Sequence, residues 1–441
     1  MSVVNVSLQS KTPDSASGKG SIFPAGHMMP FSLVTSLFFM WAVPNNLNDV
    51  LIRQFMKSFA LTRFEAGLVQ SAFYMGYFLL AIPAALLMRR YGYKVGILVG
   101  LALFSTGTFL FWPAAIEGKY LYFLGALFVI ASGLSFLETA SNPFIAQIGD
   151  QSSSERRLNF SQAFNPLGAI AGVLIGTIFI FSGVELTPAQ IVSMKAQHLY
   201  DAYLQTETLR VVKPYVVLGV VAFLLALVIL RTKFPAIQSE HEAESGDQGH
   251  FLDLLNYPHF LFAIAAQFMY VGAQVGTWSY FIQYVQESTH QPEKIAGYFL
   301  TGTLVAFGVG RFASAYLMRF IEPNKMLGVF ALINVLLVTV GVMHSGWIGL
   351  WAIFLTSFFM SLMFPTIFAL GIKGLGSNTK IGGSLIIMAI IGGAILTPAM
   401  GLLSEAGHGV ALAYLVPLVC YVFVAAYAFL GSTRGLVADT L

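Results

Sequence analysis

Residues 326–372 read MLGVFALINVLLVTVGVMHSGWIGLWAIFLTSFFMSLMFPTIFALGI and contain no Asp, Glu, Lys or Arg. A helix needs about 20 predominantly apolar residues to cross the hydrocarbon core of a bilayer. The run is long enough for two such helices around the turn His344-Ser345-Gly346. This stretch therefore predicts a pair of transmembrane helices.

The same pattern extends over the rest of the chain. Ten further runs without a charged residue lie at 20–48, 66–88, 95–116, 120–137, 158–184, 214–230, 254–286, 295–310, 381–404 and 406–433. The first run continues past Asp49 toward Phe55, and the fourth continues past Glu138 to Gly149. Charges are costly in lipid-facing helices, so these runs mark the spans. We predict an all-α membrane protein with twelve transmembrane helices.

The composition excludes several classes of protein. The 441 residues are 57% hydrophobic and only 10% charged, and the mean hydropathy is +0.76. A soluble protein carries roughly 25% charged residues, so a large soluble catalytic domain is ruled out. The net charge of +3 is too small to form a nucleic-acid surface. The single cysteine, Cys420, cannot form an intramolecular disulfide.

The chain divides into two halves. Its most polar internal segment lies between the sixth and seventh predicted spans. Three short motifs of the first half recur in the second, namely LMR at 87–89 and 317–319, PxIxx(I/L)G at 143–149 and 365–371, and GAI at 168–170 and 393–395. Duplicated halves around a central site are typical of secondary transporters. The predicted boundaries are a tail at 1–29, halves at 30–230 and 257–431, a linker at 231–256, and a tail at 432–441.

The distribution of Lys and Arg predicts the orientation in the membrane. An even number of spans places both termini on one side, which then carries fifteen Lys and Arg residues against eight on the other. Cytoplasmic loops are enriched in these residues, so we expect both termini in the cytoplasm. The first 26 residues are polar and predict a disordered tail, not a cleaved signal peptide.

Two acidic residues lie deep within predicted spans. Of the twenty acids in the chain, only Asp49 and Glu138 do so. An ionisable group at this depth faces a bundle interior or a water-filled cavity, where it can bind and release a proton. The pair therefore favours proton coupling. The alternatives are an Asp49–Arg53 ion pair at i,i+4 spacing and a structural bridge between helices at Glu138.

Amide side chains accompany the two acids at helical spacing. Asn46 lies in the run PNNLND, Asn142 follows Glu138 by one turn, and Gln162 and Asn165 are three residues apart. Amides both donate and accept hydrogen bonds, as the hydroxyls of a neutral sugar require when they leave water. We predict that these side chains line a sugar-binding cavity. Hydrogen bonds between helices are the alternative for Gln162 and Asn165.

Polar and aromatic residues of other spans complete the predicted site. Gln274 and Trp278 lie in the seventh span, Phe364 in the tenth and Trp41 in the first. An aromatic ring can stack on the apolar face of a sugar, although aromatic residues in membrane helices more often pack the protein interior. Both interpretations stay open for Trp41 and Trp278.

Four longer motifs carry a resemblance to a known family. They are FMWAVPNNLND at 39–49, LETASNPF at 137–144, RLNFSQAFN at 157–165 and FPTIFALGIK at 364–373. They resemble the L-fucose–proton symporter family of the major facilitator superfamily, and the likeness runs from about Pro30 to Gly431. The resemblance implies the major facilitator fold, with two pseudo-symmetric six-helix bundles.

The resemblance also implies roles for individual residues. Asp49 and Glu138 match the two membrane carboxylates that serve protonation and substrate recognition in this family. Asn46, Gln162 and Asn165 match polar positions that line its central cavity.

Two positions bear on the substrate that the resemblance implies. Relatives that carry glucose, galactose or amino sugars tend to lack the acid at the position of Glu138, so this residue favours the fucose branch. The fucose symporter has a tyrosine at the position of Phe364, and the chain lacks that hydroxyl.

These observations predict a proton-coupled importer of L-fucose or a related hexose that works by alternating access. We expect a monomer in the bacterial inner membrane, whose partners are a monosaccharide, protons and the lipid bilayer, with no obligatory protein partner. No catalytic nucleophile or metal cluster accompanies the acids, so we expect no enzyme activity, metal or cofactor. The alternatives are coupling to Na⁺, specificity for glucose, galactose or an amino sugar, and a sugar-sensing receptor.

Overall fold

The computed structural model describes residues 23–24, 26–149, 157, 160–235, 251–318, 320–344, 346–375, 378–406 and 409–432. Within these residues the chain is all-α, and twelve helical spans are long and apolar enough to cross a membrane, as the sequence predicted. Most of residues 1–29 and of the 231–256 linker lie outside the described part of the chain, and so does nearly all of the 432–441 tail.

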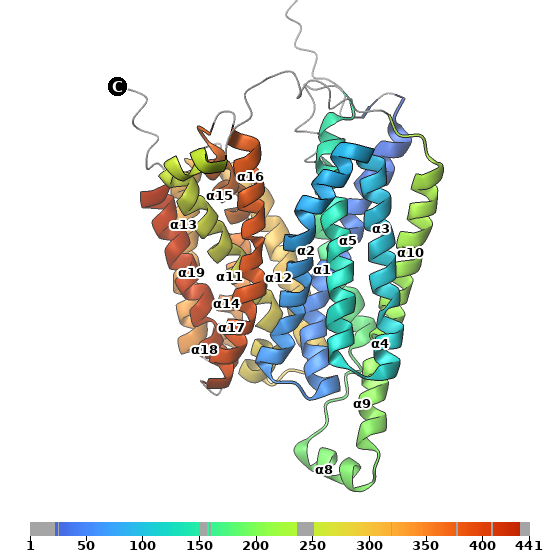
Figure 1. Cartoon of the computed structure of the whole chain (residues 1–441). Coiled ribbons are helices and arrows are strands. Elements are labelled where there is room, and N and C mark those ends of the chain that lie inside the picture. The colour runs from blue at the N-terminus through green and yellow to red at the C-terminus, as the bar shows by residue number, and fades with distance from the viewer. Residues whose placement is uncertain are drawn as a thin grey trace, which may run out of the picture.

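The spans form two bundles (Figure 1). The first contains α1 (Met28–Phe59), α2 (Arg63–Tyr91), α3 (Tyr93–Phe109), α4 (Phe111–Glu117), α5 (Tyr120–Gln147), α7 (Phe164–Ile175), η2 (Gly176–Ile180), α8 (Pro188–Ala196), α9 (Tyr200–Leu209) and α10 (Val212–Arg231). The second begins with η4 (Phe251–Asn256) and contains α11 (Pro258–Thr289), α12 (Glu293–Leu317), α13 (Pro323–Met343), α14 (Trp347–Met360), α15 (Met363–Ile372), α16 (Thr379–Met388), η6 (Ala389–Ile391), α17 (Gly392–Ala406), α18 (Val410–Ala413), α19 (Leu415–Ala426) and η7 (Tyr427–Gly431).

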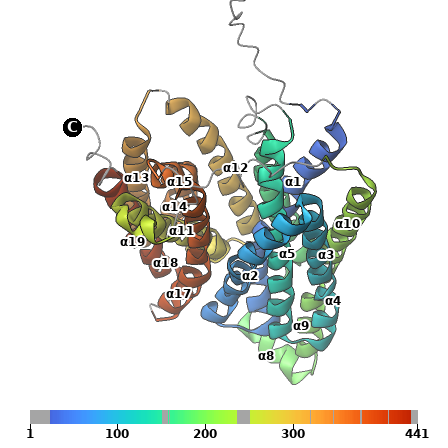
Figure 2. The same ribbon diagram turned by 45° about the horizontal axis from the view of Figure 1, so that its top comes forward.

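The bundles diverge toward the end at which α10 finishes at Arg231 and η7 at Gly431 (Figures 1 and 2). We call this the terminus end and the opposite end the distal end. Most span boundaries differ by a few residues from the predicted runs, and two of these differences bear on the function. The sixth span begins at Tyr200 instead of 214, because α9 continues it beyond the distal end. The eighth extends to Ser314 instead of 310, which places Arg311 inside a helix and not in a loop.

Close approach of α1 and α7 organises the first bundle. A Cβ atom at Gly168 would lie 2.2 Å from the carbonyl oxygen of Phe39, and one at Gly172 would lie 2.4 Å from that of Val43. Only glycine allows two helix backbones to approach this closely. The contact holds α1 against α7 along the side that carries Phe39 and Val43, and Asp49 lies further along the same helix.

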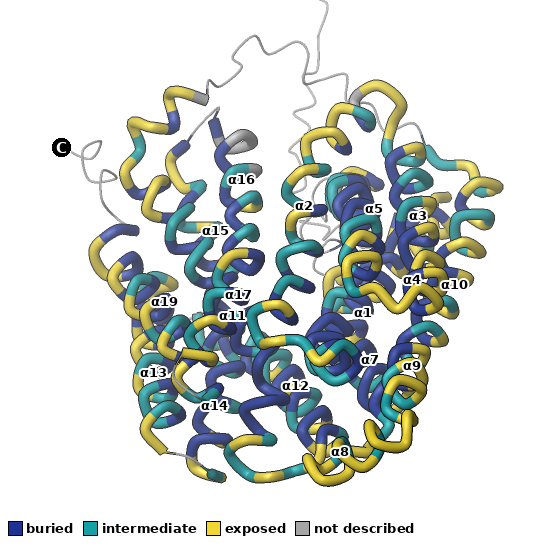
Figure 3. Tube along the Cα trace, turned by 60° about the horizontal axis from the view of Figure 1, so that its bottom comes forward, coloured by how far each residue is buried: buried dark blue, intermediate teal, exposed yellow. Residues whose placement is uncertain are grey.

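The two bundles meet along α2 and α17 from the distal end to mid-depth. Ser71 donates a hydrogen bond to the carbonyl oxygen of Ala394 (2.6 Å), and Arg63 donates one to Ser404 (2.7 Å). Figure 3, in which the distal end is turned forward, shows buried segments of α7, α11 and α12 between the bundles. Further toward the terminus end, Leu79 and Leu86 of α2 are exposed. The halves are therefore closed on each other at the distal end.

An ion cluster joins the bundles at this end. Lys57 Nζ of α1 lies 3.1 Å from a carboxylate oxygen of Glu207 on α9 and 3.2 Å from one of Glu293 on α12. It also donates to the carbonyl oxygen of Val184 (2.7 Å). The Glu293 side chain is completely buried. We call Lys57, Glu207 and Glu293 the distal ion cluster.

Candidate functional site

A cavity of about 200 Å³ lies between the two bundles near mid-depth. This is below the roughly 300–1,000 Å³ of pockets for drug-sized ligands, as suits a smaller molecule. Its walls come from α1, α2, α5 and α7 of the first bundle and from α11, α12, α15 and η6 of the second. Both predicted carboxylates, Asp49 and Glu138, line it.

Asp49 is 4% exposed and makes no ion pair with Arg53 within the described residues. Its Oδ1 accepts hydrogen bonds from Gln70 Nε2 and Ser279 Oγ, both at 3.0 Å. Arg53 instead lies 3.9 Å from Glu185. The ion-pair interpretation of Asp49 is therefore wrong for this structure.

Glu138 lines the cavity from α5, and Tyr77 donates a hydrogen bond to its Oε1 (2.9 Å). The neighbouring Tyr74 hydroxyl lies 3.5 Å from Asn45 Oδ1. Gln70, Tyr74 and Tyr77 all line the cavity from α2, and none of them was among the residues predicted from the sequence. Their i, i+4, i+7 spacing within an otherwise apolar run was the signal that marks one helix face.

Three of the predicted amides line the cavity: Asn46, Asn165 and Gln274. Asn46 donates to the carbonyl oxygen of Ala42 one turn earlier on α1 (2.9 Å), which leaves its amide oxygen available. The three amides lie on both sides of the cavity, on α1, α7 and α11. Hydroxyl groups of a bound ligand can therefore be paired from both bundles.

Two predicted amides do not line the cavity. Gln162 is exposed and donates to Asn142 Oδ1 (3.3 Å), while Asn142 Nδ2 donates to the carbonyl oxygen of Glu138 (3.0 Å). The structure thus places this pair in contacts within the first bundle. In this conformation Gln162 therefore hydrogen-bonds to another helix, which was the alternative to sugar binding.

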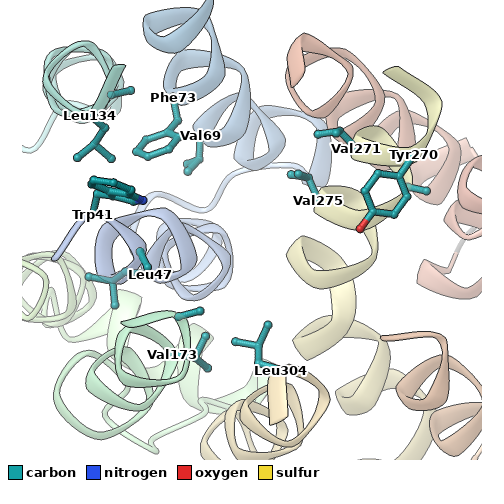
Figure 4. Packing of buried hydrophobic residues seen from close by; sticks show 14 of the residues in the cluster. Trp41, Leu47, Val69, Phe73, Leu134, Val173, Tyr270, Val271, Val275 and Leu304 are labelled. Atoms are coloured by element: carbon teal, nitrogen blue, oxygen red, sulfur yellow. The ribbon is translucent and has the colours of Figure 1, made fainter. Parts of the chain in front are cut away.

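The predicted aromatic residues separate into two groups. Trp278 and Phe364 line the cavity, and Trp278 Nε1 is held by a hydrogen bond to Ser357 (3.1 Å). Trp41 is only 3% exposed and does not line the cavity. It packs in an apolar cluster with Phe73 and Leu134, because α2 and α5 cover this turn of α1 (Figure 4). The placement of Trp41 in the site is therefore wrong for this structure.

One cation also lines the cavity. Arg311 of α12 lies with its guanidinium 5.2 Å from the centroid of the Phe307 ring, which is a cation–π contact. Arg311 directly follows the uncharged run 295–310, so the sequence predicts it outside the eighth span. The cavity therefore contains two carboxylates from the first bundle and one guanidinium from the second.

The described residues contain no group of three or more His, Cys, Asp and Glu side chains that can hold a metal ion. What they do contain is an amphipathic cavity at the interface of two six-helix bundles. Buried ionisable groups at such a midplane interface are typical of membrane transport proteins. The fold and the site together define a membrane transport protein with a central cavity between two helical bundles.

Comparison with known proteins gives the family. Residues 29–381 match the model of the Major Facilitator Superfamily. The chain is 45% identical to the L-fucose–proton symporter of Escherichia coli over 91% of its own length and 93% of the relative's. It is 34% identical to a glucose/galactose transporter of Brucella abortus, over 90% and 93% of the two chains. The chain belongs to the major facilitator superfamily, in the family of the L-fucose–proton symporter, and is a transporter, not an enzyme.

A solved structure confirms the fold. The chain is similar to the crystal structure of a major facilitator superfamily transporter in the outward conformation, with 44% sequence identity and a TM-score of 0.67. The match covers 91% of this chain and 98% of the other.

Proposed function

We propose that this protein imports L-fucose in symport with protons across the bacterial inner membrane. The observation that carries the proposal is the placement of Asp49 and Glu138 in one cavity between the two bundles. The identity to a symporter with that substrate over nearly the whole chain supports it. The sugar and the proton then occupy the same cavity, so that both cross the membrane together when the bundles rock.

Each group of cavity residues has a task in this mechanism. Asp49 and Glu138 bind the transported proton, and Asn165 and Gln274 pair with sugar hydroxyls from opposite bundles. Trp278 and Phe364 offer apolar faces to the sugar ring. With both termini in the cytoplasm, the distal end is extracellular and the structure is the inward-open state. The comparison with the outward structure supports this. Two chains that are 44% identical share one fold, so a TM-score of 0.67 between them points to a different arrangement of the two bundles.

Gradient-driven uptake in proteoliposomes tests the proposal. The purified protein should accumulate radiolabelled L-fucose under an inward proton gradient, with no requirement for Na⁺. A strict Na⁺ requirement, or no accumulation of L-fucose under any gradient, would overturn it.

Specificity for a different hexose is the second candidate. It is favoured by Phe364, which lines the cavity without the hydroxyl of a tyrosine, and by the identity to glucose/galactose transporters. Competition of unlabelled D-glucose and D-galactose with labelled L-fucose distinguishes the two. Equal competition by all three sugars would favour the broader specificity.

Replacing Asn165 by Ala should weaken sugar binding by about 1–3 kcal/mol, or roughly 5- to 150-fold, because a sugar hydroxyl loses its partner in a partly dry cavity. Gln162→Ala should weaken binding less, since Gln162 does not line the cavity. Isothermal titration of the folded variants measures both. Unchanged affinity in Asn165→Ala would assign this residue to helix packing instead.

Replacing Asp49 by Asn should flatten the pH dependence of uptake. In the wild type, uptake should fall as the outside pH rises, because the carboxylate must be protonated for inward flux. The double variant Asp49→Asn/Arg53→Gln should not recover function, since Arg53 pairs with Glu185 and not with Asp49. Recovery of proton-driven accumulation in the double variant would show that Asp49 only balances the charge of Arg53.

A further inference from the structure

The hydrogen bonds of Asp49 cross the boundary between the two bundles. Asp49 on α1 and Gln70 on α2 belong to the first bundle, whereas Ser279 on α11 belongs to the second. Ser279 Oγ lies 3.0 Å from Asp49 Oδ1, and Gln70 Nε2 lies 2.9 Å from Ser279 Oγ. Asp49 is 4% exposed, and the other two residues are 1% exposed. A cavity carboxylate is thus bonded directly to the opposite half.

The donors and acceptors of this triad match an ionised Asp49. The two hydrogens of Gln70 Nε2 reach Asp49 and Ser279, and the single hydroxyl hydrogen of Ser279 reaches Asp49. An ionised carboxylate accepts hydrogen bonds only, so all three donors are used. Hydrogen bonds to a charged acceptor are roughly twice as strong as those between neutral groups. Ionised Asp49 therefore holds the bundles together more strongly than protonated Asp49 does.

The triad also contains an acceptor for the protonated form. Gln70 Oε1 is buried and has no hydrogen-bond partner among the described residues. Rotation of the Gln70 amide presents this oxygen to a carboxylic acid proton on Asp49. Protonated Asp49 then keeps a strong partner within its own bundle, while the bond to Ser279 across the boundary loses its charge assistance.

We propose that Ser279 is a positioning residue that couples the protonation of Asp49 to the closure of the distal end. The inference deepens the proposed function and rests on Asp49 being a proton site. Loss of the proton from Asp49 strengthens the Ser279 bond and favours the distal-closed state. Protonation weakens the bond and lets the distal end open.

The pH response caused by Asp49 must be distinguished from that of the other titratable and charged groups near it. Tyr74 and Tyr77 of α2, Glu138 of α5 and Arg311 of α12 share the cavity, and Arg53 lies one turn further along α1. The cavity walls contributed by α7, α11, α15 and η6 carry no charged side chain. Glu138 is the other carboxylate, so the Asp49→Asn variant isolates the contribution of Asp49.

The test measures how far the distal end closes as a function of pH. Spin labels at L121C and L412C, on exposed distal segments of the two bundles, report the distance in the full chain, in a Cys420→Ala background. From acidic to alkaline pH, the distal-closed to distal-open ratio of the otherwise unmodified protein should rise roughly tenfold. Ser279→Ala should remove most of this rise, and Ser279→Thr, which keeps the hydroxyl, should retain it.

Ser71→Ala is the matched control. Ser71 also donates across the boundary, but to the neutral carbonyl oxygen of Ala394, so its loss should lower the distal-closed to distal-open ratio by the same factor at every pH. A full pH response in Ser279→Ala, together with its loss in Asp49→Asn, would overturn the inference and leave the proposed function standing. An unchanged pH response in Asp49→Asn would overturn the inference together with the role of Asp49 as a proton site, while gradient-driven uptake still tests L-fucose–proton symport separately. The pH profile of L-fucose exchange by the same variants gives a second readout.

Discussion

Replacing Glu138 by Gln is expected to abolish gradient-driven accumulation of sugar while sugar exchange continues. Gln mimics the protonated side chain in size and polarity, and the hydrogen bond from Tyr77 can be kept by its amide oxygen. The sugar site therefore stays intact, whereas no proton can be released from this position. Counterflow and pH-driven uptake, measured in the same proteoliposomes, separate the two activities.

Glu322→Gln is the control for this experiment. Glu322 is exposed at the start of α13, where it lies 3.1 Å from Lys325. Exposed pairs contribute about 0–1 kcal/mol, so the control should accumulate sugar like the wild type. Normal accumulation by Glu138→Gln under a pH gradient would show that Glu138 is not a coupling group.

Replacing Lys57 by Met should shift the protein strongly toward the state that is open at the distal end. The change leaves the carboxylates of Glu207 and Glu293 buried without their cation. Removing one partner of a buried ion pair costs about 3–5 kcal/mol, which is a hundredfold or more in the equilibrium constant. Opening the distal end relieves this cost, because it returns the carboxylate of Glu293, which belongs to the opposite bundle, to water. The spin-label distance between the bundles measures the shift.

Two variants complete the Lys57 experiment. Lys57→Met/Glu293→Gln should recover part of the distal-closed fraction, because one of the unpaired charges is removed as well. Lys325→Met removes an exposed lysine from its pair with Glu322 and should leave the distance distribution unchanged. A wild-type distribution in Lys57→Met would mean that the distal ion cluster does not hold the halves together.

The sequence predicted the fold because the bilayer imposes it locally. Each span must be a helix of about 20 apolar residues, whatever the other spans do. Hydropathy and charge therefore located all twelve spans within the described residues. The two boundary errors with functional consequences, at the start of the sixth span and the end of the eighth, fall where a helix carries charges beyond its apolar run. Arg210 is such a case, since it donates to the carbonyl oxygen of Ile180 at the distal end.

The sequence by itself also determined which residues are chemically unusual. Asp49 and Glu138 stood out because a carboxylate in a membrane span is costly, and the structure places both in one cavity. Only the tertiary structure decided which neighbours they meet. In the structure Trp41 packs in the interior and Arg311 lines the cavity. Asp49 accepts a hydrogen bond from Ser279 of the other bundle. Contacts between residues more than 200 positions apart depend on how helices pack, and helical periodicity records only which residues share a face.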